Sequence, residues 1–380
     1  MNTAKVSAIP ITIDGNEANV VNRVGSNVYA FQILKEIEHQ TRDDNALSFE
    51  VLLQSPPITE LPKSRKGWRY RVIGPQPLWT QVALPLYLWK NKQRIGLHYT
   101  PGHYTPRFCP VQYVSSVMDL GFLAYPDQFL KKDLHKLRAW TAFSVKGAQK
   151  VVAISKYTKQ DVCQVYGRDP ADVIVAPPAL NSNPQEVSQE KQRALLEELA
   201  IATPYILFVG TIQPRKNLER LIKAFEILRT TQPEVQLVLA GKDGWLAEGI
   251  HQKAEQSSAR DAIRFLGFVT EEQKAALYMS AECVVLPGLH EGFGIPPLEA
   301  LQYGIVPVVA NTTSLPEVVG EAGILVDPTS VESIADGVSR ALSLSVQEKN
   351  NYSQKAAEQL KKYSWENSAR TIVKTISSLL

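Results

Sequence analysis

The sequence predicts an α/β protein made of two doubly wound parallel sheets, each in a domain of its own. Short apolar stretches alternate with amphipathic helical stretches through both halves of the chain, which is the pattern of strands and helices around parallel sheets. The 380 residues are enough for two domains of ordinary size. With 44% hydrophobic and 21% charged residues, the composition is that of a soluble globular protein.

The first half predicts one sheet and its helices. A strand is expected over residues 5–13, with Pro10 moving it toward a sheet edge or a bulge. After a polar loop, a helix over residues 27–40 has its apolar side chains on one face. Further strands are expected over residues 49–53, 68–73, 95–100, 111–117, 151–154 and 173–176. Further helices are expected over residues 78–89, which Pro85 interrupts, 127–149 and 156–166.

A turn-rich segment over residues 177–184 separates the halves, and a charged helical stretch follows it over residues 189–199. The second half then predicts strands over residues 205–210, 236–240, 263–266, 283–287, 305–310 and 323–326. Asn217 is a good N-cap for a helix over residues 218–228. Further helices are expected between residues 245 and 263 and over residues 271–279, 298–303, 331–344 and 358–380, the last with Trp365 near its middle.

A strand-to-helix turn with an acid at each end runs from Glu291 to Glu299. Its double proline suits a helix start, which places Glu299 in or near the first helical turn. The N–H groups of the turn and of the helix start form an anion site, and both glutamates could accept hydrogen bonds from hydroxyls beside the anion. A phosphate next to hydroxyls describes a nucleotide sugar. The alternative is an ordinary turn with a glutamate favoured by the helix dipole.

Arg215 and Lys216 are the second candidate, because two adjacent cations follow the strand glycine Gly210 just before a helix start. Arginine offers a planar fork and lysine a point charge, which together suit a diphosphate. Surface charge on a loop is the alternative. The pair belongs to the same sheet edge as the turn that begins at Glu291, which favours a shared site.

Loops of the first half carry further candidates. Gly25 lies at the start of the helix over residues 27–40, which is a possible anion-binding end. His103 follows the strand over residues 95–100, and Met118 and Asp119 follow the next strand. These loops belong at the carboxyl edge of a sheet, where open α/β folds bind ligands.

The charge is distributed unevenly between the halves. Residues 1–180 carry 22 Lys and Arg against 14 Asp and Glu, or +8, whereas residues 181–380 carry 19 against 24, or −5. A basic first half indicates an anionic partner, such as an acidic lipid surface or a phosphate-bearing acceptor. A solvated surface with uneven charge is the alternative. No nucleic-acid-binding motif accompanies the charge, so nucleic acid is not expected.

Cysteine usage and hydropathy exclude several classes. Cys109, Cys163 and Cys283 are far apart and form no Cys-x-x-Cys pair, which disfavours a disulfide framework or a cysteine-rich metal site. This usage fits a reducing cytoplasm. The chain contains no uncharged apolar run of transmembrane length and no signal-peptide pattern, so we expect a cytoplasmic protein, peripheral at most on the inner membrane face.

The sequence resembles glycosyltransferase family 4, also called group 1. The residues that carry the resemblance are Gly-Thr-Ile-Gln-Pro-Arg-Lys-Asn at 210–217, the stretch 291–299 and Leu-Pro-Glu-Val at 315–318. The likeness covers most of the chain and is most specific over residues 205–328. The chain lacks both the dinucleotide Gly-x-Gly-x-x-Gly pattern and the P-loop pattern. Members of this family are retaining, nucleotide-sugar-dependent transferases with the GT-B fold, in which two Rossmann-like domains face a cleft.

The resemblance implies a role for each matching residue. Arg215 and Lys216 are expected to neutralise the donor diphosphate, and Glu299 to accept hydrogen bonds from the nucleotide ribose. Glu291 is expected to approach the hydroxyls of the donor sugar. The other residues implied at the site are the backbone of Phe293, Gly294 and Ile295 at the sugar and phosphate, together with Gly210, Gly25, Asn27 and Asp119.

Two departures from the family pattern concern the first half. Family members often carry glycine where this chain has Asn27, and asparagine adds bulk to the loop. Many carry His-Asp where this chain has Met118-Asp119, and that histidine contacts the donor sugar. Met118 can neither donate a hydrogen bond nor carry a proton. His103 on the neighbouring loop is one substitute, although a lone loop histidine is more often unrelated.

The resemblance implies an acceptor-binding domain over residues 1–185, a nucleotide-sugar-binding domain over residues 186–362 and a helix over residues 363–380 that returns to the first domain. We expect a metal-independent retaining hexosyltransferase without a cofactor. GDP-mannose is slightly favoured over UDP-glucose as donor, and the acceptor is a glycan or a lipid-linked sugar. The alternative is a weak or inactive nucleotide-sugar-binding partner subunit, and a GT-B epimerase or phosphorylase fits the motifs less well.

Overall fold

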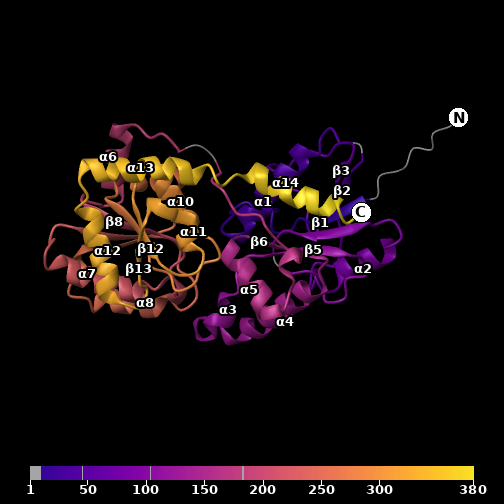
Figure 1. Cartoon of the computed structure of the whole chain (residues 1–380), viewed down its shortest axis with the longest axis horizontal. Coiled ribbons are helices and arrows are strands. Elements are labelled where there is room, and N and C mark those ends of the chain that lie inside the picture. Colours follow the sequence, from indigo (N-terminus) through magenta and orange to yellow (C-terminus); the bar gives the residue numbers. More distant parts are fainter. Residues whose placement is uncertain (1–9, 45, 103, 182–183) are drawn as a thin grey trace. The chain divides into compact units, whose positions relative to one another are not determined.

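The computed structural model describes residues 10–44, 46–102, 104–181 and 184–380. The chain forms two compact units, each built around a parallel sheet (Figure 1). The first unit takes Met1–Leu120, Lys132–Pro178 and Ser364–Leu380, and the second takes Gly121–Lys131 and Ala179–Tyr363. The predicted α/β class with two doubly wound parallel sheets is therefore confirmed.

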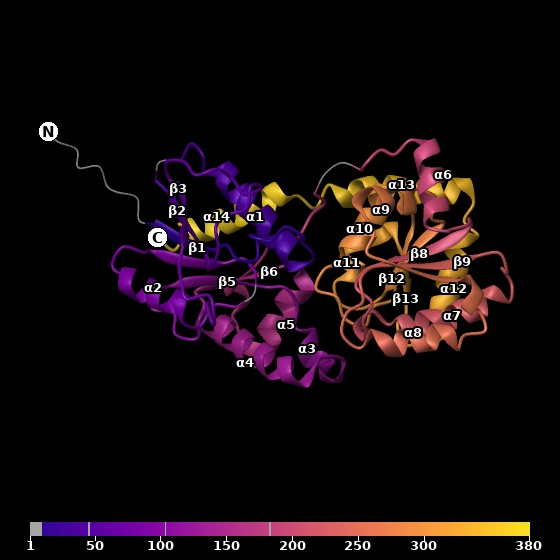
Figure 2. The ribbon, with the colours of Figure 1, turned by 180° about the vertical axis from the view of Figure 1, so that it is seen from behind.

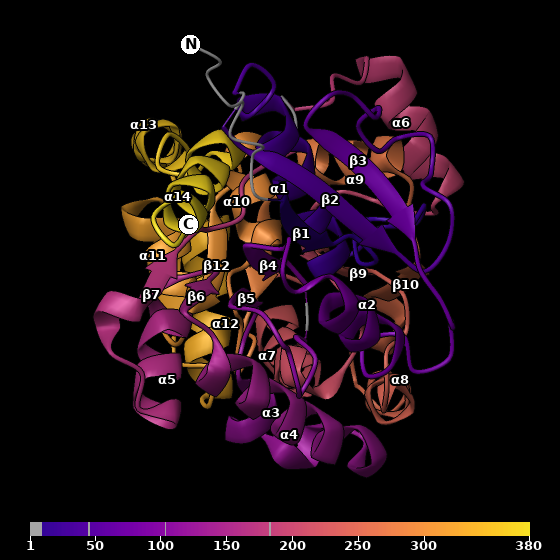
Figure 3. The ribbon, with the colours of Figure 1, turned by 90° about the vertical axis from the view of Figure 1, so that its right-hand side faces the viewer.

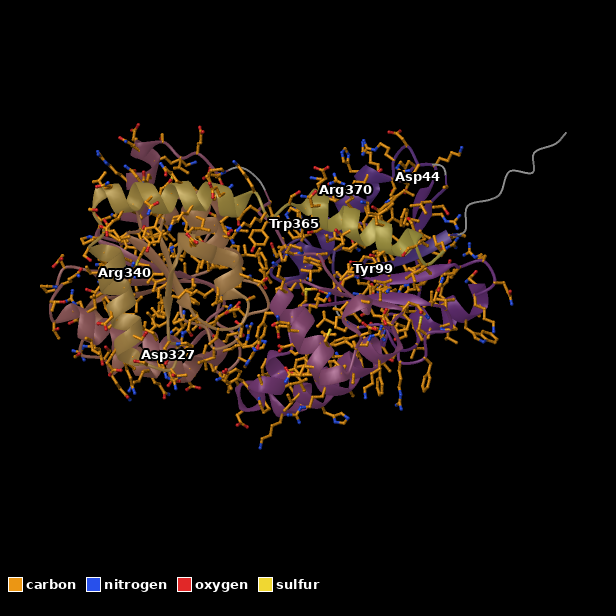
Figure 4. All side chains as sticks on the ribbon, viewed as in Figure 1. Asp44, Tyr99, Asp327, Arg340, Trp365 and Arg370 are labelled. Atoms are coloured by element: carbon orange, nitrogen blue, oxygen red, sulfur yellow. The ribbon has the colours of Figure 1, made fainter. Side chains whose placement is uncertain are left out.

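The first unit contains a seven-stranded parallel sheet in the order β3-β2-β1-β4-β5-β6-β7, which Figure 3 shows in sequence. Its strands are β1 (Pro10–Asp14), β2 (Ser48–Leu53), β3 (Trp68–Val72), β4 (Leu97–Thr100), β5 (Tyr113–Val117), β6 (Lys150–Ala153) and β7 (Val173–Val175). The interior strands are apolar because both of their faces are covered. Tyr99 of β4 is fully buried in this core, where its hydroxyl lies 3.1 Å from Ser116 Oγ (Figure 4).

Helices cover both faces of the first sheet (Figures 1 and 2). One face carries α1 (Ser26–Gln40) and α14 (Trp365–Ser377), and the other carries α2 (Ala83–Asn91), α4 (Lys131–Gly147) and α5 (Lys156–Tyr166). Trp365 packs edge-on against Tyr29 of α1, with ring centroids 5.8 Å apart. This contact holds the C-terminal helix on the first unit.

The second unit contains a six-stranded parallel sheet in the order β10-β9-β8-β11-β12-β13. Its strands are β8 (Tyr205–Val209), β9 (Gln236–Ala240), β10 (Ile263–Gly267), β11 (Cys283–Leu286), β12 (Pro307–Ala310) and β13 (Ile324–Val326). One face carries α7 (Leu218–Arg229), α8 (Ala247–Glu255) and α12 (Val331–Leu342) (Figure 2). The other carries α6 (Gln189–Glu198), α9 (Glu271–Ser280), α10 (Ile295–Gln302) and α13 (Val346–Leu360) (Figure 2). The topology reverses between β8 and β11, where ligands bind in open α/β sheets.

The structure corrects several predicted helices. The helix expected over residues 127–149 begins only at Lys131, after the short α3 (Gly121–Ala124). The helix expected over residues 358–380 is two helices, because α13 ends at Leu360 and the Ser364 side chain caps α14 by accepting from Asn367 N–H. Trp365 is thus the first residue of α14. The short α11 (Leu315–Val319) and most of α13 were not predicted.

Two further corrections concern individual residues. Asn217 does not cap α7 with its side chain; its backbone is left-handed and its Nδ2 donates to the carbonyls of Pro287 and Pro328. Pro85 does not interrupt α2, because the helix begins at Ala83 and a proline in the first turn sacrifices no helical hydrogen bond. The expected strand over residues 5–13 is seen from Pro10 onward, and its earlier part lies outside the described residues.

The units change at positions near the predicted boundaries of 185 and 362. The chain enters the second unit after Pro178 and leaves it after Tyr363. The segment Gly121–Lys131, which follows β5, groups with the second unit and was expected in the first.

Candidate functional site

The loops that follow β8 and β9 are packed tightly together at the carboxyl edge of the second sheet. Gly210 and Gly241 have φ angles of 151° and 155°. A Cβ at Gly241 would lie 1.9 Å from the Gly210 carbonyl oxygen, so this approach requires glycine. The Ile212 N–H donates to the Lys242 carbonyl at 2.9 Å, which joins the two loops.

Arg215 and Lys216 end a single 3-10 turn, Pro214–Lys216, and both reach the carboxylate of Glu291. Lys216 Nζ lies 2.7 Å from Glu291 Oε1, and Arg215 Nη1 lies 3.2 Å from Oε2. Arg215 also donates to the His290 carbonyl. The side chains of Arg215, Lys216 and Glu291 are 13%, 12% and 7% exposed. Three predicted site residues thus form one buried charge cluster with two cations and one carboxylate.

The turn between β11 and α10 is fixed by hydrogen bonds and by glycine. Ser314 Oγ lies within hydrogen-bonding distance of the carbonyls of Glu291, at 2.8 Å, and of Phe293, at 2.7 Å. Gly294 has a φ of 118°, and a Cβ there would lie 2.7 Å from Leu315 Cδ2. The backbone of Phe293, Gly294 and Ile295 is therefore held in one shape beside Glu291.

The start of α10 is an unusual helix N-terminus. Gly294 is the N-cap, and no side chain in the described part of the chain caps this end. Pro296 and Pro297 lack an N–H group, so fewer backbone donors than usual emerge here. The donors that remain in the first turn are those of Ile295 and Leu298, so the predicted anion site would have fewer donors than an ordinary helix start.

Glu299 lies just past the first turn of α10, which begins at Ile295, so it is near the predicted place. Its two carboxylate oxygens contact α9. Lys274 Nζ lies 2.9 Å from Oε1, and the Tyr278 hydroxyl donates to Oε2 at 2.7 Å. Glu299 is thus bound to α9, while Glu291 is bound to the loop after β8. The sequence analysis did not identify Lys274 or Tyr278, although their i, i+4 spacing on an expected helix places them on one face.

In the first unit, the loop after β1 closes on the start of α1. Gly25 is exposed and has a φ of 51°. The side-chain amide of Asn27 donates to Glu17 Oε2 at 2.6 Å and to the Glu17 carbonyl at 3.2 Å. The side chain of Asn27, at a position where the family often has glycine, therefore stabilises this loop. Glu17 was not among the predicted site residues, and only its place in the polar loop was visible in the sequence.

The loops after β4 and β5 bring a second group of residues to the same edge of the first sheet. Met118 and Asp119 are partly buried, and the Thr158 hydroxyl lies 3.4 Å from the Met118 carbonyl. Burial and, to a smaller extent, the negative charges of Glu17 and Asp119 raise the pKa of the Tyr104 hydroxyl to about 12. The predicted residue His103 lies outside the described residues.

Asp14, at the end of β1, has a carboxyl group with a raised pKa. Burial, and to a smaller extent the charge of Glu17, raises this pKa from 3.8 to about 7. A hydrogen bond from the Asn16 N–H at 3.0 Å opposes the rise. Asp14 therefore titrates near neutral pH.

Within residues 10–44, 46–102, 104–181 and 184–380, no three His, Cys, Asp or Glu side chains gather as a possible metal-ion site. In the same ranges, no helix combines the length and apolar character that crossing a membrane requires.

Comparison with known proteins identifies the family. Residues 192–360 match the family model for glycosyl transferases group 1. The O-antigen chain mannosyltransferase B of Escherichia coli is 30% identical over 281 residues, which is 71% of this chain and 71% of that protein. The chain belongs to the group 1 glycosyltransferases.

Other similar proteins agree with this assignment. The serotype-specific mannosyltransferase WbdA of Escherichia coli is 34% identical over 201 residues. That match covers 51% of this chain and 24% of the longer WbdA chain. Among solved structures, Anabaena HepE in complex with UDP and glucose has a TM-score of 0.73 at 18% identity. That match covers 97% of this chain and all of the other, and it shows that the two proteins share the GT-B fold.

Proposed function

We propose that this glycosyltransferase moves a hexose from a nucleotide diphosphate sugar to a glycan or lipid-linked acceptor with retention of configuration. The observation that carries the proposal is the buried cluster of Arg215, Lys216 and Glu291 beside the glycine turn into α10. Two cations and fixed backbone donors stabilise the charge that develops on a leaving diphosphate. The carboxylate holds both cations in place before the donor arrives.

The proposed chemistry needs no protein nucleophile. The bond between the sugar carbon and the phosphate oxygen breaks, and its electrons leave with the nucleoside diphosphate. The freed phosphate oxygen takes the proton of the attacking acceptor hydroxyl on the same face of the sugar. On this route Met118, which cannot carry a proton, is compatible with catalysis. The protein supplies charge stabilisation through Arg215 and Lys216, and position through Glu291 and Glu299.

GDP-mannose is our preferred donor, with UDP-glucose second. The preference for a mannose donor is supported by the similarity to the O-antigen chain mannosyltransferase B of Escherichia coli, which extends over most of both chains. Against it, HepE is described in complex with UDP and glucose, although at 18% identity that likeness concerns the fold. No metal or cofactor is proposed, because the two cations of the cluster can stabilise a diphosphate without one.

A lipid-linked acceptor at the inner membrane face agrees with the surface of the first unit. Between Glu60 and Asp119 the chain carries nine Lys and Arg residues and no Asp or Glu. In this segment, large apolar side chains are solvent-exposed: Leu78 by 70%, Leu86 by 50%, Trp89 by 59% and Phe108 by 77%. Cations beside exposed aromatic rings suit the interface of an anionic bilayer. We therefore propose peripheral membrane contact through this segment.

A second candidate is a nucleotide-sugar-binding partner subunit without transferase activity. Met118 motivates it, because it replaces the family histidine that contacts the donor sugar. The intact cluster of Arg215, Lys216 and Glu291 favours the enzyme. The two candidates differ in turnover rather than in donor binding.

The proposal is tested by measuring release of GDP from GDP-mannose, and of UDP from UDP-glucose, with and without candidate glycan acceptors. The expected result is acceptor-dependent release of one nucleotide, with the product linkage in the anomeric configuration of the donor by NMR. An inverted product would overturn the retaining mechanism. Tight donor binding without release in the presence of any acceptor would favour the partner subunit.

A further inference from the structure

Two side chains of α9 bind Glu299, one at each carboxylate oxygen. Lys274 Nζ lies 2.9 Å from Oε1, and the Tyr278 hydroxyl lies 2.7 Å from Oε2. An ionised carboxylate has about four lone-pair sites, so one acceptor position remains on each oxygen. Two parallel acceptor positions match a pair of adjacent hydroxyls.

We propose that Lys274 and Tyr278 are positioning residues that orient Glu299 to accept hydrogen bonds from both vicinal hydroxyls of the donor ribose. This inference rests on the proposed function, because it takes Glu299 as the ribose ligand. Neither residue needs to touch the donor. Each acts by preventing rotation of the Glu299 carboxylate. Without these contacts, the carboxylate could rotate so that only one oxygen faces the ribose.

Tyr278 is built as a rigid support. Its ring is fully buried and stacks on Tyr303, with centroids 5.4 Å apart and planes 6° apart. The Tyr303 hydroxyl in turn accepts from the Gln185 N–H at 3.1 Å. Burial raises the pKa of Tyr278 well above 10.0, and the charge of Glu299 adds to the rise. The hydroxyl therefore keeps its proton and remains a donor to Glu299.

Lys274 fixes the other oxygen through an ion pair. Its side chain is only 22% exposed, and it also lies 2.9 Å from Glu271 Oε2. Burial lowers the pKa of Lys274, but attraction to Glu299 and hydrogen bonds to both glutamates outweigh that effect, and the pKa is raised. Lys274 is thus charged at any pH at which the enzyme is assayed.

The test compares a ribonucleotide with its analogue that lacks both hydroxyls. GDP and 2′,3′-dideoxy-GDP are titrated into each variant by calorimetry, and UDP and its dideoxy analogue replace them if UDP binds more tightly. We expect the wild type to prefer the ribonucleotide at least about tenfold, because hydrogen bonds to a charged partner discriminate strongly. Tyr278→Phe keeps the ring but removes the donor, and should reduce this preference to about twofold.

Tyr205→Phe is the matched control. Tyr205 is also fully buried, and its hydroxyl donates to the Leu277 carbonyl at 2.7 Å, not to Glu299. The Tyr205→Phe variant should keep the wild-type preference for the ribonucleotide. Lys274→Met should lose the preference and Lys274→Arg should retain part of it, which provides a second test if Tyr278→Phe does not fold. In turnover, Tyr278→Phe should raise the donor KM about tenfold with kcat within about twofold, as expected for loss of uniform binding.

The outcomes separate this inference from the proposed function. If Glu299→Ala keeps the wild-type preference, Glu299 is not the ribose ligand and the assignment of the donor site fails. If Glu299→Ala loses the preference while Tyr278→Phe and Lys274→Met keep it, the positioning role alone is overturned.

Discussion

The three charges of Arg215, Lys216 and Glu291 make sense as an electrostatically preorganised set. Each is almost buried, and a buried charge without a partner would be strongly destabilising. Glu291 pairs with both cations and holds them in place. In the proposed function, a diphosphate therefore meets cations that are already ordered, so little reorganisation accompanies the loss of the leaving group.

Arg215→Ala and Lys216→Ala should each reduce kcat/KM for the donor by at least about tenfold, because each removes a cation from the leaving diphosphate. Lys223→Ala is the control, since Lys223 is an exposed cation on the neighbouring α7. Steady-state kinetics measure the effect. Activity of either site variant equal to that of the control would contradict the placement of the diphosphate.

Met118→His restores the family residue beside Asp119. If this position faces the donor sugar, the added hydrogen-bond donor should change kcat/KM for GDP-mannose relative to UDP-glucose. The ratio of the two values is compared with that of the wild type. An unchanged ratio and an unchanged rate would mean that Met118 does not face the sugar.

Asp14 should make stability depend on pH. Its folded pKa of about 7 lies above the unfolded value of 3.8, so the folded state binds the proton more tightly. The stabilisation is complete below the unfolded pKa and is lost as the pH rises toward the folded one. Between pH 4 and pH 8, the Tm of the wild type should fall relative to that of Asp14→Asn, which has no such proton. A constant Tm difference across this range would refute the shift.

At the scale of single residues, the sequence predicted which side chains lie close together better than it predicted their hydrogen-bond partners. The expectation that Arg215 and Lys216 share a sheet edge with Glu291 agrees with their ion pairs. The sequence did not predict that Asn217 would bind two carbonyls instead of capping α7, because that contact depends on loops distant in the chain. Lys274 and Tyr278 were missed for the same reason. Nothing local to α9 indicates that it packs beside Glu299.

At the scale of elements, amphipathic helices and buried strands were predicted closely, because their periodicity is local. The helix over residues 156–166 has the predicted bounds. The long C-terminal helix was wrong because helical propensity does not show where one helix stops and another begins. There, the Ser364 cap restarts the helix after a short break. Short helices such as α11 have too few residues for a period to be visible.

The helix α2 carries apolar side chains on its buried face and also on its exposed face, where a helix that only contacts water usually has polar side chains. Ala83, Leu84 and Leu88 face the core, while Leu86 and Trp89 point outward. Phe108 follows Arg107, whose N–H contacts the Gln81 side chain at 3.4 Å, two residues before α2 begins. This outward face is the element proposed to meet the membrane.

Trp89→Ser combined with Phe108→Ser should reduce binding to vesicles that contain anionic phosphatidylglycerol by at least about tenfold, because aromatic rings anchor at the interface. Val346→Ser is the control, since Val346 is 77% exposed at the start of α13 in the second unit. Cosedimentation measures binding, and turnover with a soluble acceptor should stay unchanged. Equal binding of the double variant and the control would reject this surface.

At the scale of the whole molecule, each unit brings its candidate residues to the carboxyl edge of its own sheet. In the second unit these are the cations and carboxylates of the proposed donor site. In the first they are the loops after β1 and β5, with Asn27, Met118 and Asp119. The predicted fold class needed only the alternation of strands and helices. The contribution of the first unit to the reaction could not be predicted as well, because its loops depart from the family pattern at Asn27 and Met118.

We expect the second unit to bind a nucleotide sugar through Arg215, Lys216 and Glu291 without a metal ion. The decisive measurement is calorimetric titration of GDP-mannose and UDP-glucose into the protein in EDTA. One donor should bind in EDTA, added Mg²⁺ or Mn²⁺ should leave its affinity within about twofold, and Arg215→Ala should weaken it about tenfold or more. Binding that appears only with a divalent metal, or that Arg215→Ala leaves intact, would contradict this proposal.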